Sequence, residues 1–213
     1  MGGITVQGNR TKMTNILLVL SLSLIALTIV FPLFYMLLNT FKGINEYLRN
    51  PLALPRKLNF ENYITMFTGY NVHIYFRNSL VTSVISLGLT IAVSIPASYA
   101  FAKINFRFNS QIYIAILSLM MIPSTVTLIP RYIMFSRMHL VDNLFALIVS
   151  YSIGSLPFSV YMLTANFKGI PNAMIEAAKV DGATYFRILR SVVVPVGRPA
   201  IVTISIVNFI NYW

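Results

Sequence analysis

Charged residues are so widely spaced in this chain that they divide it into long uncharged stretches. Four of these stretches contain 29, 25, 23 and 25 residues. They lie between Lys12 and Lys42, Arg77 and Lys103, Arg107 and Arg131, and Asp142 and Lys168. An α-helix needs about 20 apolar residues to cross the hydrocarbon core of a bilayer, and a charge at its centre is costly. The sequence therefore predicts membrane-spanning helices at about 15–40, 79–101, 110–130 and 143–166.

The composition agrees with a membrane protein and excludes other classes. The chain is 57% hydrophobic and 10% charged, whereas soluble domains carry about 25% charged residues. Its net charge of +11 does not indicate nucleic-acid binding, because the basic residues are scattered and flank apolar stretches. There is no cysteine, and the two histidines, His73 and His139, stand alone. We therefore expect no metal site and no catalytic residues.

A fifth span is expected at 192–213. Only 15 uncharged residues follow Arg198, so the span must begin before it, which places Pro195, Arg198 and Pro199 in its first turns. Such a helix is barely complete or cut short, and the chain reads as a fragment of something longer. The expected fold is an all-α, polytopic helical membrane protein.

The loops between the predicted spans give a weak indication of orientation. The inner candidates are 1–14, 102–109 and 167–190, and the outer ones are 41–78 and 131–142. Basic residues are slightly more numerous in the inner set, as the positive-inside rule requires. Within the first outer loop, LNFENYITMF suits a short interfacial helix. A packed connector is the favoured interpretation of that helix, and an amphipathic lid is the alternative.

One polar segment interrupts this apolar chain at 176–195, EAAKVDGATYFRILRSVVVP. Residues 171–181 suit a helix, because Pro171 fits a first helical turn and most of the following side chains are small or apolar. Gly182 then ends that helix in the manner of a C-terminal glycine. Asp181 or Thr184 is a candidate cap for a second helix. We therefore expect a helix, a glycine turn and a second helix between two spans.

Three interpretations of this segment compete. A DNA-binding helix-turn-helix is disfavoured, because the segment lies at a membrane surface and its second helix carries only one pair of arginines. A solvated connector without a partner leaves the small residues unexplained. A docking element explains them, because Ala177, Ala178 and Gly182 permit the close approach of another protein and Glu176 offers it a carboxylate.

The pattern E-A-A-x-x-x-G, followed after nine residues by aliphatic-x-aliphatic-Pro, resembles the EAA loop of bacterial binding-protein-dependent ABC importer permeases. Its positions are Glu176, Ala177, Ala178, Gly182, Val192, Val194 and Pro195. The family pattern usually has Ile and Leu where the two valines stand. Further segments resemble the sugar-importer branch, which includes the maltose-type second permease. They are NSL at 78–80, ASYAFAKINF at 97–106, MIPSTVTLIPRYIMF at 121–135 and IPNAMIEAAKVDGAT at 170–184.

The resemblance implies a bundle of the type I ABC importer permease kind, with five spans present and the sixth missing. It implies a multi-pass subunit of the bacterial inner membrane that translocates a sugar or oligosaccharide and is not an enzyme. The implied partners are a second homologous permease, a cytoplasmic ATPase dimer, an extracellular solute-binding protein and the lipid bilayer, with no nucleic acid. No cofactor is implied, because ATP is bound by the ATPase. The implied docking residues are Glu176, Ala177, Ala178, Gly182 and Pro195, with the loop 167–190 and the amino terminus cytoplasmic.

Polar side chains within the spans are candidates for lining a solute pathway. These are Ser124, Tyr151, Ser155, Asn208 and Asn211. Asn208 and Asn211 are three residues apart and are expected to share a helix face. A buried asparagine in a membrane needs a hydrogen-bond partner, which is more often another helix than a solute.

Three alternatives for the function remain at this point. One is an importer permease for a solute other than a sugar. Another is a channel or a secondary transporter that works without ATP, which is disfavoured because all five acidic residues lie outside the predicted spans and none is available for proton coupling. A purely structural membrane protein would leave the docking motif without a role.

Overall fold

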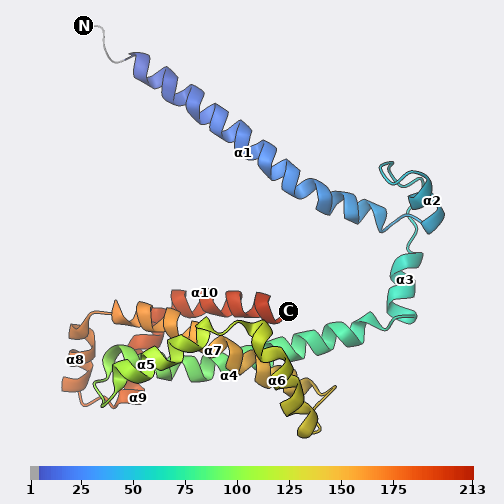
Figure 1. The fold of residues 1–213 in the computed structure, drawn as a ribbon. Coiled ribbons are helices and arrows are strands. Elements are labelled where there is room, and N and C mark those ends of the chain that lie inside the picture. Colours follow the sequence, from blue (N-terminus) through green and yellow to red (C-terminus); the bar gives the residue numbers. More distant parts are fainter. Residues whose placement is uncertain (1–4) are drawn as a thin grey trace. The chain divides into compact units, whose positions relative to one another are not determined.

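The structure, a computed structural model, describes residues 5–213 and divides the chain into two compact units, one ending at His73 and the other starting at Ile74. Each unit is described by itself. All regular elements between residues 5 and 213 are helices, and no strand occurs there (Figure 1). The expected all-α class is therefore confirmed. The extreme amino terminus, which was expected to be cytoplasmic, lies outside the described residues.

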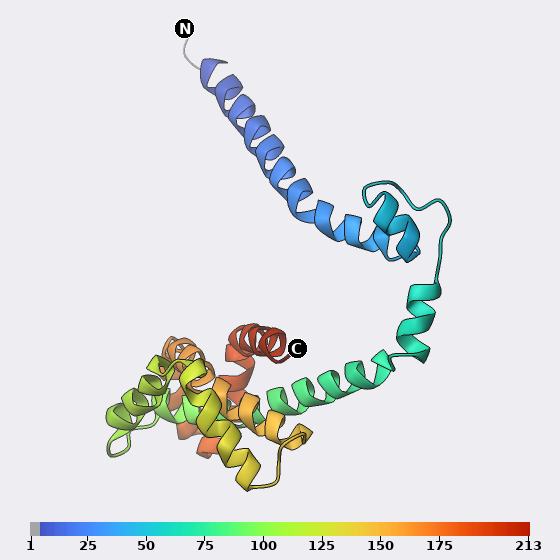
Figure 2. The same cartoon turned by 45° about the vertical axis from the view of Figure 1, so that its right-hand side comes forward.

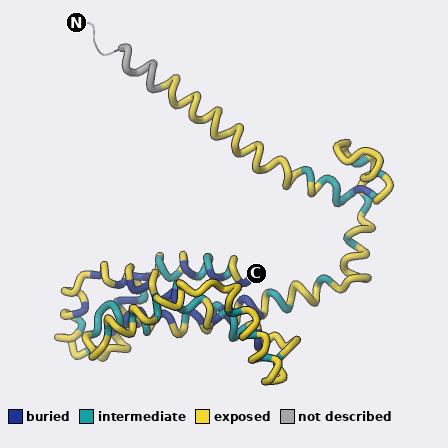
Figure 3. The backbone as a smooth tube through the Cα atoms, in the orientation of Figure 1, coloured by how far each residue is buried: buried dark blue, intermediate teal, exposed yellow. Residues whose placement is uncertain are grey.

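The first unit consists of α1 (Thr5–Asn39), α2 (Ile44–Arg49) and α3 (Glu61–Thr68). From Lys12 onward α1 is long and apolar enough to span a membrane, and no residue of its most apolar stretch is buried within the first unit (Figure 3). Such a helix is stable in a bilayer, because its backbone N–H and C=O groups form hydrogen bonds within the helix and its side chains are apolar.

The expected short helix in the first outer loop is present as α3, and it packs as a connector. Asn62 Nδ2 donates to the carbonyls of Thr40 and Lys42 at 2.9 and 3.0 Å. The Tyr63 hydroxyl lies 2.7 Å from Thr40 Oγ1, and its ring packs against Phe41. These contacts hold α3 against the residues that follow α1 and favour the packed connector over a free lid.

The second unit holds α4 (Val72–Lys103, whose first residues precede the unit), α5 (Asn109–Ser118), α6 (Ser124–Arg137) and α7 (Leu144–Lys168). These are followed by α8 (Asn172–Val180), α9 (Tyr185–Ile188) and α10 (Val194–Tyr212). Figure 1 shows α8 as a short helix at one end of this unit, and Figure 2 shows the same helices turned by 45°.

Helices α4 and α7 run parallel and are joined by small polar side chains. Ser86 Oγ donates to the Ile148 carbonyl, Thr90 Oγ1 to that of Ser152 and Ser98 Oγ to that of Val160, at 3.4, 3.4 and 3.2 Å. Each pair is separated by 62 positions, and a constant separation means that the two helices point the same way. The buried residues on this face of α4 are Thr82, Ser83, Ser86, Thr90, Ser94 and Ser98. Such small residues let helix backbones approach closely. Close packing of this kind holds helices together in a membrane, where the lipid tails are as apolar as the helices and the hydrophobic effect does not drive association.

Helix α10 runs antiparallel to α7 and packs along it. Its first turns lie against Phe167, because a Cβ built on Gly197 would be 2.5 Å from Phe167 Cε1. Further along, Asn208 Nδ2 donates to Ser159 Oγ at 2.9 Å. Near its end the Tyr212 ring stacks on Tyr151 with centroids 5.4 Å apart. The residue numbers of the contacts therefore decrease along α7 as they increase along α10, as in an antiparallel pair.

The predicted single span at 110–130 is wrong as a continuous helix. Helix α5 passes into a 3₁₀ turn, Leu119–Met121, and the chain then breaks before α6, with a 94° bend between the two halves. Pro123 explains the break, since a residue that precedes proline is driven out of the helical region, and Ile122 has ψ of 114°. Because α4 and α7 are parallel, the chain between them must travel back from the end of α4 to the level at which α4 began. This favours a broken crossing of the membrane over a re-entrant loop.

Four described helices are long and apolar enough to cross a membrane, and the bent pair makes a fifth. The last runs without interruption from Tyr185 to Tyr212, so the helix that contains the expected span begins before residue 192. A π-helical segment, Leu189–Val193, joins α9 to α10. Pro195 has no N–H and its ring crowds the carbonyl four residues earlier, and the wider π turn accommodates this.

The apolar core lies at the end of the second unit that carries α8. Its buried residues are Tyr99, Leu163, Phe167, Ile170, Ile175, Ile188, Leu189, Val193 and Ile204. These come from α4, α7, α8, α9 and α10 and from the turns between them, so all of these elements are packed together at this end.

Candidate functional site

Helix α8 carries the sequence motif and is anchored by a single buried side chain. Ile175 is 4% exposed and packs in the core, and Ile170, in the turn before the helix, is buried to the same extent. The other face of α8 has no covering element within the second unit. Glu176 and Ala177 are exposed there, and Val180 is 88% exposed. This face of α8 is therefore open to solvent within the second unit.

The C-terminal end of α8 is a glycine cap of the Schellman type. Ala183 N–H donates to the Ala178 carbonyl and Gly182 N–H to the Lys179 carbonyl, both at 3.0 Å, which is the hydrogen-bond pattern of that motif. Gly182 has φ of +74°, and a Cβ added to it would meet no atom within 4 Å. The glycine is therefore required by its backbone conformation and not by lack of space.

Beyond the cap the chain enters the last long helix. The Thr184 side chain accepts from Arg187 N–H at 3.4 Å, so Thr184 is the cap of the two candidates. Ile188 is fully buried in the core, whereas Tyr185 and Phe186 are exposed. The exposed surface of α8 thus continues onto the first turn of α9. We call the exposed residues Met174, Glu176, Ala177, Val180, Gly182, Tyr185 and Phe186 the docking surface, after the docking role that the sequence resemblance implies for three of them.

The structure separates the five predicted docking residues. Glu176, Ala177 and Gly182 belong to the docking surface, whereas Ala178 is half-buried on the side of α8 that faces the core. Pro195 is exposed but lies in the first turn of α10, so it belongs to the last long helix and not to α8.

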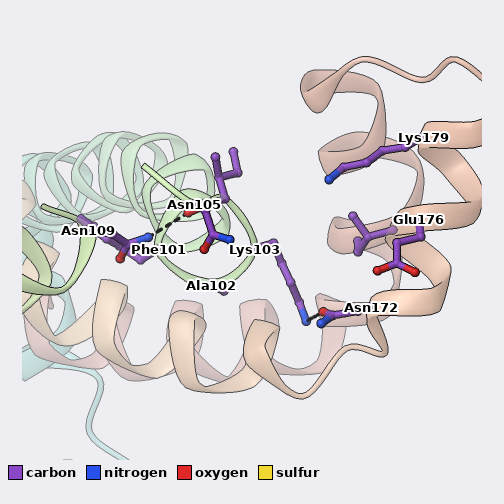
Figure 4. A pocket seen from close by; sticks show the side chains of 10 residues that line it. Phe101, Ala102, Lys103, Asn105, Asn109, Asn172, Glu176 and Lys179 are labelled. Atoms are coloured by element: carbon purple, nitrogen blue, oxygen red, sulfur yellow. Dashed lines mark hydrogen bonds between the residues drawn. The ribbon is translucent and has the colours of Figure 1, made fainter. Parts of the chain in front are cut away.

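Lys103, which the sequence analysis did not single out, organises the base of α8. Its Nζ donates to the Lys168 carbonyl at 3.2 Å, to the Ile170 carbonyl and to Asn172 Oδ1 at 2.8 Å (Figure 4). A lysine ammonium has three donors, and each has an acceptor here. No motif in the sequence signals this contact, since the partners are 65 to 69 positions away.

A polar pocket of about 270 Å³ lies between the end of α4, the turn that follows it and α8. Its lining includes Lys103, Asn105, Asn109, Glu176 and Lys179 (Figure 4). Asn109 Nδ2 donates to the Ile104 carbonyl at 2.9 Å and so closes the turn after α4. The pocket places the Glu176 carboxylate near amide and ammonium groups. No cluster of His, Cys, Asp and Glu able to hold a metal occurs among the described residues.

The candidate pathway residues are dispersed. Asn208 is 1% exposed and bonds to Ser159 of α7, whereas Asn211 is exposed. The two residues lie three positions apart on α10 as expected but differ in burial, and the expectation of a helix partner for Asn208 is confirmed. Tyr151 is half-buried against Tyr212, whose hydroxyl lies 2.9 Å from Thr90 Oγ1.

Of the two remaining candidates, one lies on the same face of α7 as Tyr151 and the other lies on α6. Ser155 is half-buried on α7, and Ser124 is exposed at the first residue of α6. Sequence reasoning also missed the small polar column of α4, although its signal was available. Ser86, Thr90, Ser94 and Ser98 recur at intervals of four, which places them on one helix face.

The fold and this end of the molecule define an integral membrane protein of several apolar helices with an exposed helix attached beyond them. The model of the family "Binding-protein-dependent transport system inner membrane component" matches residues 85–213. The chain belongs to this family, which is a family of transporter permeases and not of enzymes.

Curated relatives and a solved structure extend the comparison. The chain is 37% identical over 183 residues to a putative ABC transporter permease protein of Caldicellulosiruptor, covering 85% of this chain and 66% of the relative. It is 30% identical over 185 residues to a diacetylchitobiose uptake system permease protein of Streptomyces coelicolor, covering 87% of this chain and 61% of the relative. The chain thus spans less than two thirds of the length of these relatives.

A solved bacterial ABC transporter, involved in the import of the acidic polysaccharide alginate, has the same fold. Its matching chain superposes with a TM-score of 0.83 at 21% identity and covers all of this chain and 74% of its own length. This likeness extends to the first unit as well as the second.

Proposed function

We propose that this chain is a membrane-spanning permease subunit of an ATP-driven importer for a sugar or oligosaccharide, coupled to a separate ATPase through α8. Family membership and the carbohydrate systems in which relatives are named support the class of solute. The observation that carries the proposal is α8 itself, with an apolar surface left uncovered on one side and Ile175 buried in the core on the other.

This arrangement suits the transfer of movement from a partner to the membrane helices. A push on the docking surface acts through Ile175 on a core that includes Phe167 of α7 and Val193 at the start of α10. Close-packed interiors transmit displacement and do not absorb it. Closure of a docked ATPase pair would therefore move the ends of the long helices together, and ATP would bias the equilibrium between inward-open and outward-open states.

The distribution of acidic residues supports an ATP-driven mechanism over an ion-coupled one. All five lie outside the candidate spans: Glu46 and Glu61 in α2 and α3, Asp142 before α7, Glu176 in α8 and Asp181 at its end. Proton-coupled carriers commonly rely on carboxylates within the membrane. The positions of the acidic residues therefore favour a driving energy supplied by another subunit, where ATP would be bound, and we propose no cofactor for this chain.

The proposed orientation places α8 and the amino terminus on the cytoplasmic face of the bacterial inner membrane. Basic residues gathered at the α8 end support this, as the positive-inside rule requires. They are Lys103, Arg107, Lys168, Lys179, Arg187 and Arg190. The proposed partners are a second homologous permease, an ATPase dimer at the docking surface and an extracellular solute-binding protein on the opposite face, with no nucleic acid.

The docking variants Glu176→Lys and Gly182→Leu test the proposal in the assembled transporter. Leucine at 182 is strained because φ is +74°, whereas Gly154→Leu is a matched control, since a Cβ there meets no atom within 4 Å. Both docking variants are expected to insert normally and to lose ATPase co-purification and solute uptake by about tenfold or more, as for central interface residues. Normal uptake and co-purification in both would contradict the proposal.

A further inference from the structure

Lys103 makes a direct connection between α4 and the docking helix that does not follow the chain. It is the last residue of α4 and is half-buried. Its three acceptors are the last carbonyl of α7, a carbonyl of the turn before α8 and the side chain of Asn172, which is the first residue of α8. One ammonium group therefore contacts three consecutive parts of the path into the docking helix.

The chemistry of these acceptors explains why a lysine stands there. The last carbonyls of a helix have no partner within it, and a cation at this end is favoured by the helix dipole. The Lys168 carbonyl is of this kind, and Lys103 supplies donors both to it and to the Ile170 carbonyl in the turn that follows. The Asn172 amide oxygen adds the contact that extends this cap onto α8 (Figure 4).

The rest of α4 is tied to α7 by the small polar column, so α4 is a continuous element from the column to Lys103. A displacement of α8 reaches α7 through the chain and through Ile175. It reaches α4 directly at the Lys103–Asn172 contact. Without that contact the start of α8 would be held only by the turn of residues 169–171 and by the core beneath it.

We propose that Lys103 is a positioning residue that fixes α8 relative to α4, so that ATP hydrolysis in the docked partner is coupled to movement of α4. The inference rests on the proposed function of α8. It assigns to Lys103 no contact with the solute or with ATP. Its loss is expected to separate hydrolysis from transport, whereas loss of the docking surface separates the ATPase from the permease.

The test compares Lys103→Met, Lys103→Arg and Asn172→Ala in the complete transporter, with Lys57→Met as a control for the loss of one exposed positive charge. Measured quantities are membrane content, ATPase co-purification, solute uptake and ATP hydrolysed per solute imported. Lys103→Met is expected to retain co-purification while uptake falls about tenfold, since small misplacements of a coupling group have such effects, and ATP consumed per solute rises. Lys103→Arg restores coupling at least in part, because arginine keeps the charge and several donors.

Two further results decide the inference. Asn172→Ala is expected to shift the same ratio in the same direction. The double variant with Lys103→Met is expected to be no worse than Lys103→Met alone, because Asn172→Ala removes one of the contacts that Lys103→Met already removes. If Lys103→Met inserts and shows wild-type coupling, the proposal is overturned. If Lys103→Met does not insert, wild-type coupling in Asn172→Ala overturns the proposal by itself. Glu176→Lys is measured in the same assays. If Glu176→Lys loses ATPase co-purification while the Lys103 variants couple normally, the docking function stands and the inference about Lys103 fails. If all variants behave as wild type, the docking function is refuted as well.

Discussion

Gly197 of α10 lies directly against the ring of Phe167 of α7, so close that an added Cβ would be 2.5 Å from Phe167 Cε1. Real side chains do not tolerate this distance, so the two helices can approach here only because residue 197 is glycine. The contact lies beside the core that supports α8, since Phe167 is fully buried in it. Separation of α7 from α10 would therefore disturb the packing beneath α8.

Gly197→Ala is expected to destabilise the protein by about 1–3 kcal/mol, the usual cost of overpacking a core. The measurement is the midpoint of thermal unfolding of the purified protein in detergent. Gly88→Ala is the matched control, because a Cβ at Gly88 meets no atom within 4 Å. In a helix that change is expected to be neutral or slightly stabilising. Equal midpoints for the two variants would show that the Gly197 contact is not tight in the folded protein.

The small polar column of α4 gives a second prediction. Ser94 is fully buried, so Ser94→Leu inserts bulk between α4 and its neighbours and is expected to cost about 1–3 kcal/mol. Ala92→Leu adds a comparable side chain at an exposed position of the same helix. Resistance to limited proteolysis in membranes, measured for both, should fall for Ser94→Leu alone. A stable Ser94→Leu protein would mean that the column is not a packing interface.

The hydrogen bond between Asn208 and Ser159 predicts a structural role for a residue that also stands among the pathway candidates. Asn208→Leu is expected to lower stability by about 0.6–2 kcal/mol, the range for interhelical hydrogen bonds in membranes. Solute specificity is expected to be unchanged. Thermal unfolding of the two single variants and of Asn208→Leu with Ser159→Ala gives the coupling energy of the pair. A changed order of preferred solutes, without loss of stability, would instead make Asn208 a pathway residue.

The spacing of charges was sufficient to place most helices, because a charge within a span is costly wherever the helix packs. The predicted 79–101 lies inside α4, and 143–166 lies inside α7 except for its first residue, which caps that helix. Interior prolines were less informative. Pro96 and Pro157 lie within continuous helices, whereas Pro123 separates two helices at 94°. What differs is whether the preceding residue stays helical, and that depends on packing around it.

Helix α8 and its glycine turn could be predicted because their signals are local, in Gly182 and the small residues that precede it. Lys103 could not, since its three acceptors are brought to it only by the parallel packing of α4 and α7. Pro195 belongs to the motif in sequence, yet it lies within the last long helix. A motif describes positions along the chain and does not say which of them share a surface.

The central claim, that α8 is the contact with an ATPase, is tested most directly by site-specific cross-linking. The chain has no cysteine, so Val180→Cys introduces a single thiol at a position that is 88% exposed. Leu52→Cys, at an aliphatic position 78% exposed in the first unit, is the control. In membranes that contain the whole transporter, a thiol-specific cross-linker should join Val180→Cys to the ATPase subunit and leave Leu52→Cys unlinked to it. Equal cross-linking of both variants, or an ATPase that is joined only to Leu52→Cys, would contradict the account.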